Sequence, residues 1–146
     1  MLSGAMTDTS GESDQTMAFG LLLDQRDGMI VLGLPGTEYQ LHLKLAGAAL
    51  LPKNQMVRGR IRALAMRVDK VAGGGRFIEP LYGRPRRLQG RIIAASSQAN
   101  TITVQCPCPV ECQLTADQQA SSFDVGHWVS FDVQRGATFH PSAWPG

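Results

Sequence analysis

A chain of 146 residues, 43% of them hydrophobic, can bury one core of ordinary size or two small ones. No apolar run approaches the roughly 18 residues that a membrane-spanning helix needs, and three cysteines do not make a secreted disulfide framework. The N-terminus also lacks a basic segment followed by an apolar one, so the composition predicts a cytoplasmic protein with no membrane partner.

The net charge of +2 conceals a strong asymmetry along the chain. Residues 1–52 carry two basic and six acidic residues, and residues 92–146 carry one basic and four acidic residues. Residues 53–91 carry eleven basic and two acidic residues, a balance of +9. Because such asymmetry concerns partners more than fold, this basic block is the first place to look for an interaction surface.

The first half of the chain contains several strand signals. Residues 1–16 are small, polar and acidic, which predicts a disordered acidic tail. The apolar runs 18–24 and 29–34 are separated by an Asp-Gly turn signal, and together they predict a hairpin. Residues 38–45 alternate apolar and polar side chains, which is the clearest strand pattern in the sequence.

Residues 57–70 fit either a bent strand or a helix. If the segment is a strand, the odd positions up to Ala63 form its apolar face. Beyond Ala63 the apolar residues, Leu64 and Met66, occupy even positions, so the strand would need a bulge or bend near Ala63. As a helix, the segment has an acceptable apolar face. Gly59 and the β-branched residues favour the strand. In either case the arginines of this segment are expected on one solvent face.

The second half of the chain repeats this order of elements. Two apolar runs with a polar turn between them are followed by an alternating segment at 110–114, a segment at 115–124 that fits a short helix, and a strand at 125–133. Both halves close with a phenylalanine shortly before a proline, at Phe77 and Phe139. The parallel order predicts a weak internal duplication.

A unit of three strands, a short helix and one or two more strands resembles the OB-fold and related small five-stranded barrels. The resemblance also rests on Val125-Gly126 before a strand of the second unit, where Asn54 stands in the first. It implies an all-β protein of two tandem OB-like barrels, and it leaves the ligand open, since OB-folds bind oligonucleotides, oligosaccharides and other molecules. The expected organisation is a tail at 1–16, a first barrel at 17–82, a basic connector at 83–88 and a second barrel at 89–146.

The basic block supplies the candidate site residues. Arginine binds phosphate with two parallel hydrogen bonds and stacks on bases, and aromatic side chains within the block offer stacking platforms. These features predict a non-enzymatic protein that binds RNA or single-stranded DNA. The candidate nucleic-acid-binding residues are Arg58, Arg60, Arg62, Arg67, Lys70, Arg76, Phe77, Tyr82, Arg84, Arg86, Arg87 and Arg91.

Two alternatives for the basic block remain open. The acidic flanks could neutralise it, and the chain would then be a protein-interaction or assembly module that docks on an acidic protein or on another copy's tail. Residues 84–91 also resemble the arginine-rich opening of PilZ domains, which bind cyclic dinucleotides. The second half of the PilZ signature does not match the downstream residues 95–101.

The remaining motifs favour neither a cofactor nor a catalytic site. Cys106, Cys108 and Cys112 have C-x-C-x3-C spacing, whereas zinc sites usually build on C-x2-C, so these cysteines are expected in a barrel wall rather than at a metal. The glycine run 72–76 lacks the lysine and hydroxyl of a phosphate loop and predicts a flexible hairpin tip. The three histidines lie far apart in the sequence, and we expect no enzyme activity.

Overall fold

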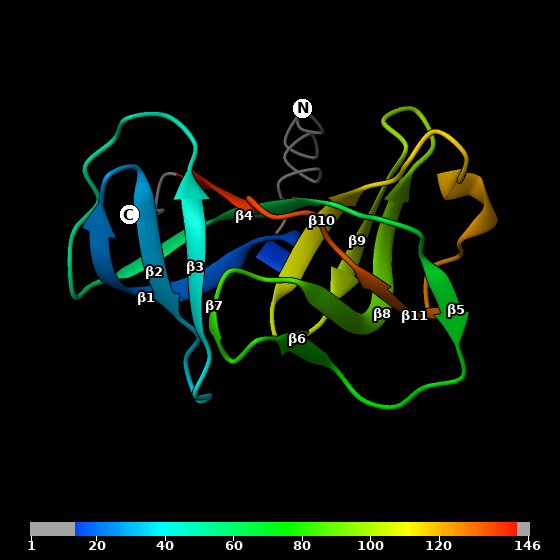
Figure 1. Cartoon of the computed structure of the whole chain (residues 1–146), viewed down its shortest axis with the longest axis horizontal. Coiled ribbons are helices and arrows are strands. Elements are labelled where there is room, and N and C mark those ends of the chain that lie inside the picture. Colours follow the sequence, from blue (N-terminus) through cyan, green and yellow to red (C-terminus); the bar gives the residue numbers. More distant parts are fainter. Residues whose placement is uncertain (1–13, 143–146) are drawn as a thin grey trace, which may run out of the picture.

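Residues 14–142 are described by a computed structural model, and nearly all of their regular secondary structure is β-strand (Figure 1). The predicted all-β class is therefore confirmed. The segment 115–124 contains only one turn of 3-10 helix, η3 (Ala120–Ser122). The strands are β1 (Ala18–Arg26), β2 (Met29–Gly33), β3 (Gln40–Leu45), β4 (Met56–Leu64), β5 (Asp69–Val71), β6 (Phe77–Glu79), β7 (Tyr82–Gly83), β8 (Arg87–Ser96), β9 (Thr101–Gln105), β10 (Pro109–Gln113), β11 (Trp128–Asp132) and β12 (Thr138–Ser142).

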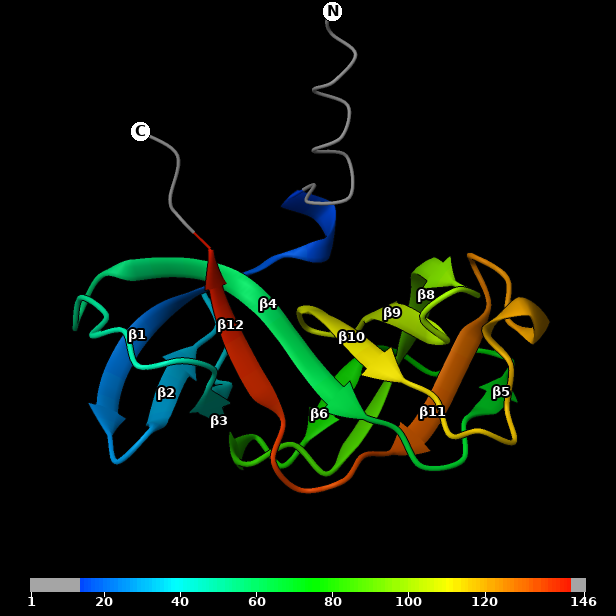
Figure 2. The same ribbon diagram turned by 90° about the horizontal axis from the view of Figure 1, so that it is seen from above.

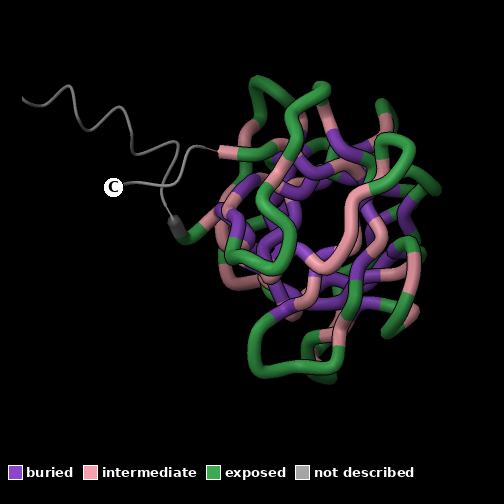
Figure 3. Tube along the Cα trace, turned by 90° about the vertical axis from the view of Figure 1, so that its left-hand side faces the viewer, coloured by how far each residue is buried: buried purple, intermediate pink, exposed green. Residues whose placement is uncertain are grey.

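Five strands close into a barrel, which we call the first barrel. Strands β1, β2 and β3 form an antiparallel meander, β12 lies parallel to β3 and antiparallel to β4, and β4 pairs with β1 to complete the circle. Alternate side chains point inward, so Leu22, Ile30, Leu41 and Phe139 are fully buried. Figure 3 views this end of the molecule and shows buried segments around the barrel wall and exposed connecting loops.

A second ring of strands lies beside the first barrel. Strands β8, β9 and β10 form a meander, β10 lies parallel to the end of β4, and β11 pairs with β8. A single bridge between Ala65, just after β4, and Val133, just after β11, closes this ring of strands. Strand β5 extends the ring at β11, and β6 pairs with β8. Buried side chains of both parts form one continuous hydrophobic cluster.

The long strand β4 serves both parts (Figure 2). Its first half pairs with β1 and β12, and its last residues pair with β10. Gly59 is required where β12 crosses, because a Cβ there would lie 2.5 Å from the His140 carbonyl oxygen and 2.6 Å from Cζ of Phe139. The strand interpretation of this segment is thus confirmed, and the helix alternative is wrong.

The bend expected near Ala63 is not found. Buried residues keep the odd positions through Ala65, while Leu64 and Met66 are 52% and 48% exposed. The register stays regular because β10 pairs with β4 up to Leu64 and the Ala65–Val133 bridge continues the ladder. The expected shift of the apolar face to Leu64 and Met66 is therefore wrong.

The last strand pairs with the first half of the chain. The sequence predicts a second unit at residues 89–146, yet β12 forms its ladders with β3 and β4. In return, the end of β4 pairs with β10. The first barrel therefore contains β12 from the predicted second unit, and the second ring contains the end of β4 together with β5 and β6 from the predicted first unit. The domain boundaries and the internal duplication stay predictions.

The glycine run does not form a hairpin tip. Strand β5 before it pairs with β11, and β6 after it pairs with β8, so residues 72–76 connect two strands that do not pair with each other. The buried Gln89 side chain donates hydrogen bonds to the carbonyl oxygens of Gly73 and Gly75. The hairpin prediction is therefore wrong, because the strands on either side of the glycine run pair with β11 and β8 rather than with each other.

The predicted tail lies mainly outside the described residues. Its last part, Asp14–Thr16, forms one turn of 3-10 helix, η2, which packs against β10. Within residues 14–142, no helix has the length and apolar character needed to cross a membrane.

Candidate functional site

The arginines of β4 lie on its outer face and are largely engaged by one carboxylate. Glu111 of β10 accepts Nη1 of Arg60 at 3.2 Å and forms an ion pair with Nε of Arg62 at 3.5 Å. The side chains of Arg60 and Glu111 are only 14% and 19% exposed. Arg58 is half-buried opposite Phe19 of β1. The expectation that all three arginines face solvent therefore fails for Arg60, which lies mostly inside the contact between β4 and β10.

Four further basic candidates are dispersed over the second ring. Arg67 forms an ion pair with Asp69 at 3.4 Å, and Nζ of Lys70 lies 5.4 Å from the centroid of the Phe123 ring. Arg91 lies over the Trp128 ring at 5.8 Å, and Arg76 and Arg91 border the same small cavity of about 190 Å³. These residues do not converge on one surface.

Within residues 14–142, neither of the two aromatic candidates lines a cavity together with a candidate arginine. Phe77 is half-buried in β6 opposite Gln89 of β8. Tyr82 is exposed and lines a different cavity, together with Leu34 and Tyr39.

Three predicted residues meet in a groove of about 770 Å³, which we call the arginine groove. Arg84, Arg86 and Arg87 line it, and Arg135 from the segment after β11 joins them. Glu79 and Asp132 are its acidic residues, and Met66, Pro80 and Val133 are its apolar ones. Four guanidinium groups therefore face two carboxylates.

Within the described part of the chain, Arg87 alone of these four arginines is bound to a carboxylate. Arg87 donates to Oδ1 of Asp132 at 2.9 Å and to Oγ of Ser130 at 2.8 Å. Arg84, Arg86 and Arg135 are exposed, and within residues 14–142 none of these three forms an ion pair. Their guanidinium groups are accessible to an external anion.

The backbone holds this part of the groove in place. The amide of Arg86 donates to the carbonyl of Glu79 at 2.7 Å, and the carbonyl of Arg86 accepts from the amide of Val133 at 2.9 Å. Pro85 between the arginines is buried. The segment expected to be a connector is thus fixed between β6 and the end of β11, and it presents its arginines from a constrained backbone.

A second cavity of about 460 Å³ adjoins the arginine groove, and we call it the β2–β3 cavity. Arg84 and Arg135 line both cavities. On its other sides lie the β1–β2 turn, the end of β3 and the segment that leads into β12. The remaining lining residues are Asp27, Gly28, Met29, His42, Lys44, Leu45, Gly136 and Ala137.

Sequence reasoning missed Arg135, Lys44 and His42. Arg135 is the only basic residue of the acidic last third, and Lys44 lies in the acidic first third, so charge counted along the chain hides both. The sequence has one local signal for Arg135, because Arg135-Gly136 comes shortly after a predicted strand. In the structure, Gly136 has a φ of +102°, as expected for a turn. A basic residue in such a turn is exposed and available.

The three cysteines are buried in the second ring. Burial raises the pKa of Cys106 to about 12 and raises the pKa of Cys108 and Cys112 well above the ordinary thiol value. Sγ of Cys106 donates to the carbonyl of Cys108 at 3.2 Å. Burial therefore disfavours the thiolate form that a metal site or a redox site requires.

Comparison with known proteins identifies no relative from which the role of this site could be taken. No protein-family model, curated protein or solved structure matches the chain. What the site can do therefore follows from its own residues: accessible guanidinium groups in concave surfaces bind oxyanions through paired hydrogen bonds.

Proposed function

We propose that this chain is a non-enzymatic binding protein that holds a single strand of RNA or DNA by its phosphates. The strand lies along the arginine groove and the β2–β3 cavity. The observation that carries the proposal is that Arg84 and Arg135 line both cavities and, with Arg86, have no carboxylate partner within residues 14–142.

The position of the β2–β3 cavity supports the same proposal. The first barrel is closed by five strands, and we interpret it as OB-like. OB-folds bind oligonucleotides on the face of strands 2 and 3 and at the loops that follow strands 1 and 4. In this barrel the corresponding elements are β2, β3, the turn at Asp27-Gly28 and the segment that leads into β12, all of which line the cavity.

The shape of the surface favours a single strand over a duplex. Proteins that read a duplex insert a protruding helix or ribbon into a groove of the DNA. Here the arginines lie in concave surfaces of about 770 and 460 Å³. A flexible single strand can enter such a surface and bring successive phosphates to Arg84, Arg86 and Arg135.

The proposal is tested by fluorescence anisotropy with mixed-sequence RNA and DNA strands of about 12 nucleotides at ~50 mM salt. Replacing Arg84, Arg86 and Arg135 together by alanine should weaken binding on the order of 100-fold, since each phosphate contact contributes about 1 kcal/mol. The loss should be similar for all sequences, because phosphate contacts carry no sequence information.

A matched control removes the same charge elsewhere. Arg26, Lys53 and Arg67 are exposed and already paired with Asp24 or Asp69, so their triple alanine variant should keep most of the affinity. Absence of binding by the unmodified chain, or equal losses in the two triple variants, would refute the proposal. Tighter binding to polyglutamate than to RNA would instead identify an acidic protein as the partner.

A further inference from the structure

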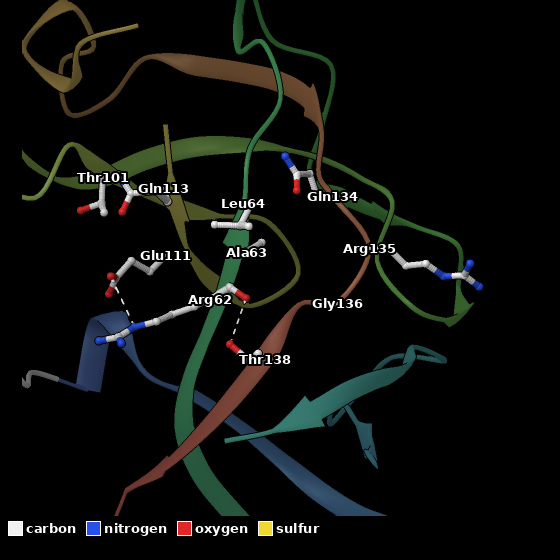
Figure 4. Close-up of a pocket in the computed structure, with 10 residues that line it drawn as sticks. All are labelled: Arg62, Ala63, Leu64, Thr101, Glu111, Gln113, Gln134, Arg135, Gly136 and Thr138. Atoms are coloured by element: carbon white, nitrogen blue, oxygen red, sulfur yellow. Dashed lines mark hydrogen bonds and ion pairs between the residues drawn. The ribbon is translucent and has the colours of Figure 1, made fainter. Parts of the chain in front are cut away.

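A third cavity, of about 350 Å³, opens beside the arginine groove, and we call it the amide pocket. Leu64 lies at its centre, with Gln113 on one side and Gln134 on the other (Figure 4). Gln113 of β10 is the register partner of Leu64 of β4. The backbone N–H of Gln134 donates to the backbone carbonyl of Leu64 at 2.8 Å. Three strand segments therefore place an apolar side chain between two side-chain amides.

The hydrogen-bonding capacity of these amides is only partly used. Nε2 of Gln113 donates to the carbonyl oxygens of Ala99 and Asn100, which fixes the side chain and leaves Oε1 as an acceptor. For the Gln134 side chain, no hydrogen bond to any of residues 14–142 is found. The pocket thus offers an apolar floor together with at least one oriented acceptor and one donor.

The charged groups of the amide pocket do not favour an anion. Arg62 points from the pocket towards Glu111 and forms an ion pair with it. The guanidinium of Arg135 points away from Leu64, as Figure 4 shows. A phosphate placed on Leu64 would therefore meet apolar surface and no unpaired cation, whereas an uncharged ring with polar edges would match the pocket.

Arg135 connects the amide pocket to the proposed interface. It lines this pocket, the arginine groove and the β2–β3 cavity, so the three cavities meet at one residue. A strand that runs from the arginine groove past Arg135 would bring a nucleoside to the mouth of the amide pocket. The volume of about 350 Å³ lies within the range of about 300–1,000 Å³ that is typical of small-ligand sites.

We infer that one base of the bound strand is unstacked from its neighbours and packs on Leu64, between Gln113 and Gln134. This inference rests on the proposed function. The flat face of the base would contact the leucine, and its polar edge would hydrogen-bond to the amides, as in recognition of unstacked bases in single strands. Phosphate contacts would then position the strand, and this pocket would be the place where a base is read.

The first experiment compares two DNA strands of equal length, one with bases and one abasic, which carry the same phosphates. Leu64→Asn should weaken binding of the base-containing strand about fivefold and leave binding of the abasic strand unchanged, since the apolar contact with the face of the base is lost and the phosphate contacts remain. Leu64 is half exposed, so the variant should fold normally, which its urea midpoint checks. Leu50→Asn, a control at a leucine that is exposed and outside all three cavities, should change neither affinity.

The second experiment places a single 2-aminopurine at successive positions of the strand. Its fluorescence should rise at one position on binding, and this rise should be lost in Leu64→Asn. If bases add no affinity and Leu64→Asn binds both strands like the unmodified chain, the inference is wrong, and the proposed function stands if the Arg84, Arg86 and Arg135 variant still loses affinity. If neither strand binds, the proposed function fails, and the inference fails with it.

Discussion

The arginines of β4 and the arginines of the arginine groove carry the same charge per side chain but differ in burial and in their carboxylate partners. Arg60 and Arg62 share the carboxylate of Glu111, and Arg60 is mostly buried. Arg84 and Arg86 are exposed and have no carboxylate partner within residues 14–142. A buried cation requires a counter-charge, whereas an exposed cation is stabilised by water and can exchange that water for a ligand. Charge density along the sequence does not distinguish these two situations.

The comparison assigns different roles to the two sets. Glu111 on β10 and the two arginines on β4 join strands from different halves of the chain, so this cluster stabilises the contact between the first barrel and the second ring. The arginine groove lies on the connections around β6 and after β11, where binding residues commonly occur. Variants of the Glu111 cluster should therefore lower the free energy of unfolding, whereas variants of the arginine groove should lower RNA affinity.

The largest effect on stability is expected for Glu111→Gln. The change leaves Arg60, which is 14% exposed, without its counter-charge, and it leaves two arginines close together. Loss of one partner from a fully buried pair costs about 3–5 kcal/mol, and we expect about 2 kcal/mol here because both groups retain some contact with water. Urea denaturation measures the free energy of unfolding, and the RNA affinity of the folded variant should not fall, because the change removes a negative charge and no phosphate contact.

Glu79→Gln is the matched control for this prediction. Glu79 lies in the arginine groove, is exposed and forms no ion pair with any of residues 14–142. Its replacement should alter the free energy of unfolding by less than about 0.5 kcal/mol and slightly increase RNA affinity. Equal stability losses in the two variants would show that the contrast between the two sets of arginines is false.

A smaller effect concerns the salt dependence of binding. Each phosphate contact to a single strand adds about 0.7 to the slope of log Kobs against log salt concentration. The triple variant of Arg84, Arg86 and Arg135 should therefore lower the magnitude of the slope by about 2, as measured by anisotropy at several salt concentrations. An unchanged slope would mean that these arginines do not contact phosphate.

The smallest effect is a pH dependence of stability at the β4 arginines. Burial lowers the pKa of His140 below its ordinary value of 6.5, and the charges of Arg62 and Arg60 lower it further, against an opposing effect of Glu111. The unfolded chain then binds a proton at a higher pH than the folded chain, so stability should fall as the pH drops below about 6.5.

Urea midpoints at about pH 7.5 and about pH 5.5 measure this dependence, which should be reduced in His140→Gln. The triple variant of the arginine groove should retain it, because His140 lies on β12 beside Arg60 rather than in that groove. If the pH dependence of stability persists in full in His140→Gln, another titrating group causes it.

Local sequence patterns predicted the elements whose partners are close in the chain. The hairpin of β1 and β2 and the strand β3 occur where apolar alternation placed them, because adjacent strands with a tight turn need little information beyond that pattern. Strict alternation through the arginines of β4 would also have placed Leu64 on the exposed face. The expected bend is absent because Leu64 and Met66, although apolar, lie on the exposed face.

The amino-acid sequence by itself determined the all-β class, the outer face of β4 and the concentration of arginines in residues 53–91. Only the tertiary structure decided that β12 returns to the first barrel, that Glu111 forms ion pairs with Arg60 and Arg62, and that Arg135 joins Arg84 and Arg86. The physical reason is separation along the chain: periodicity specifies which side of a strand is buried, whereas ion pairs and grooves depend on residues about 50 positions apart that meet through strand pairing.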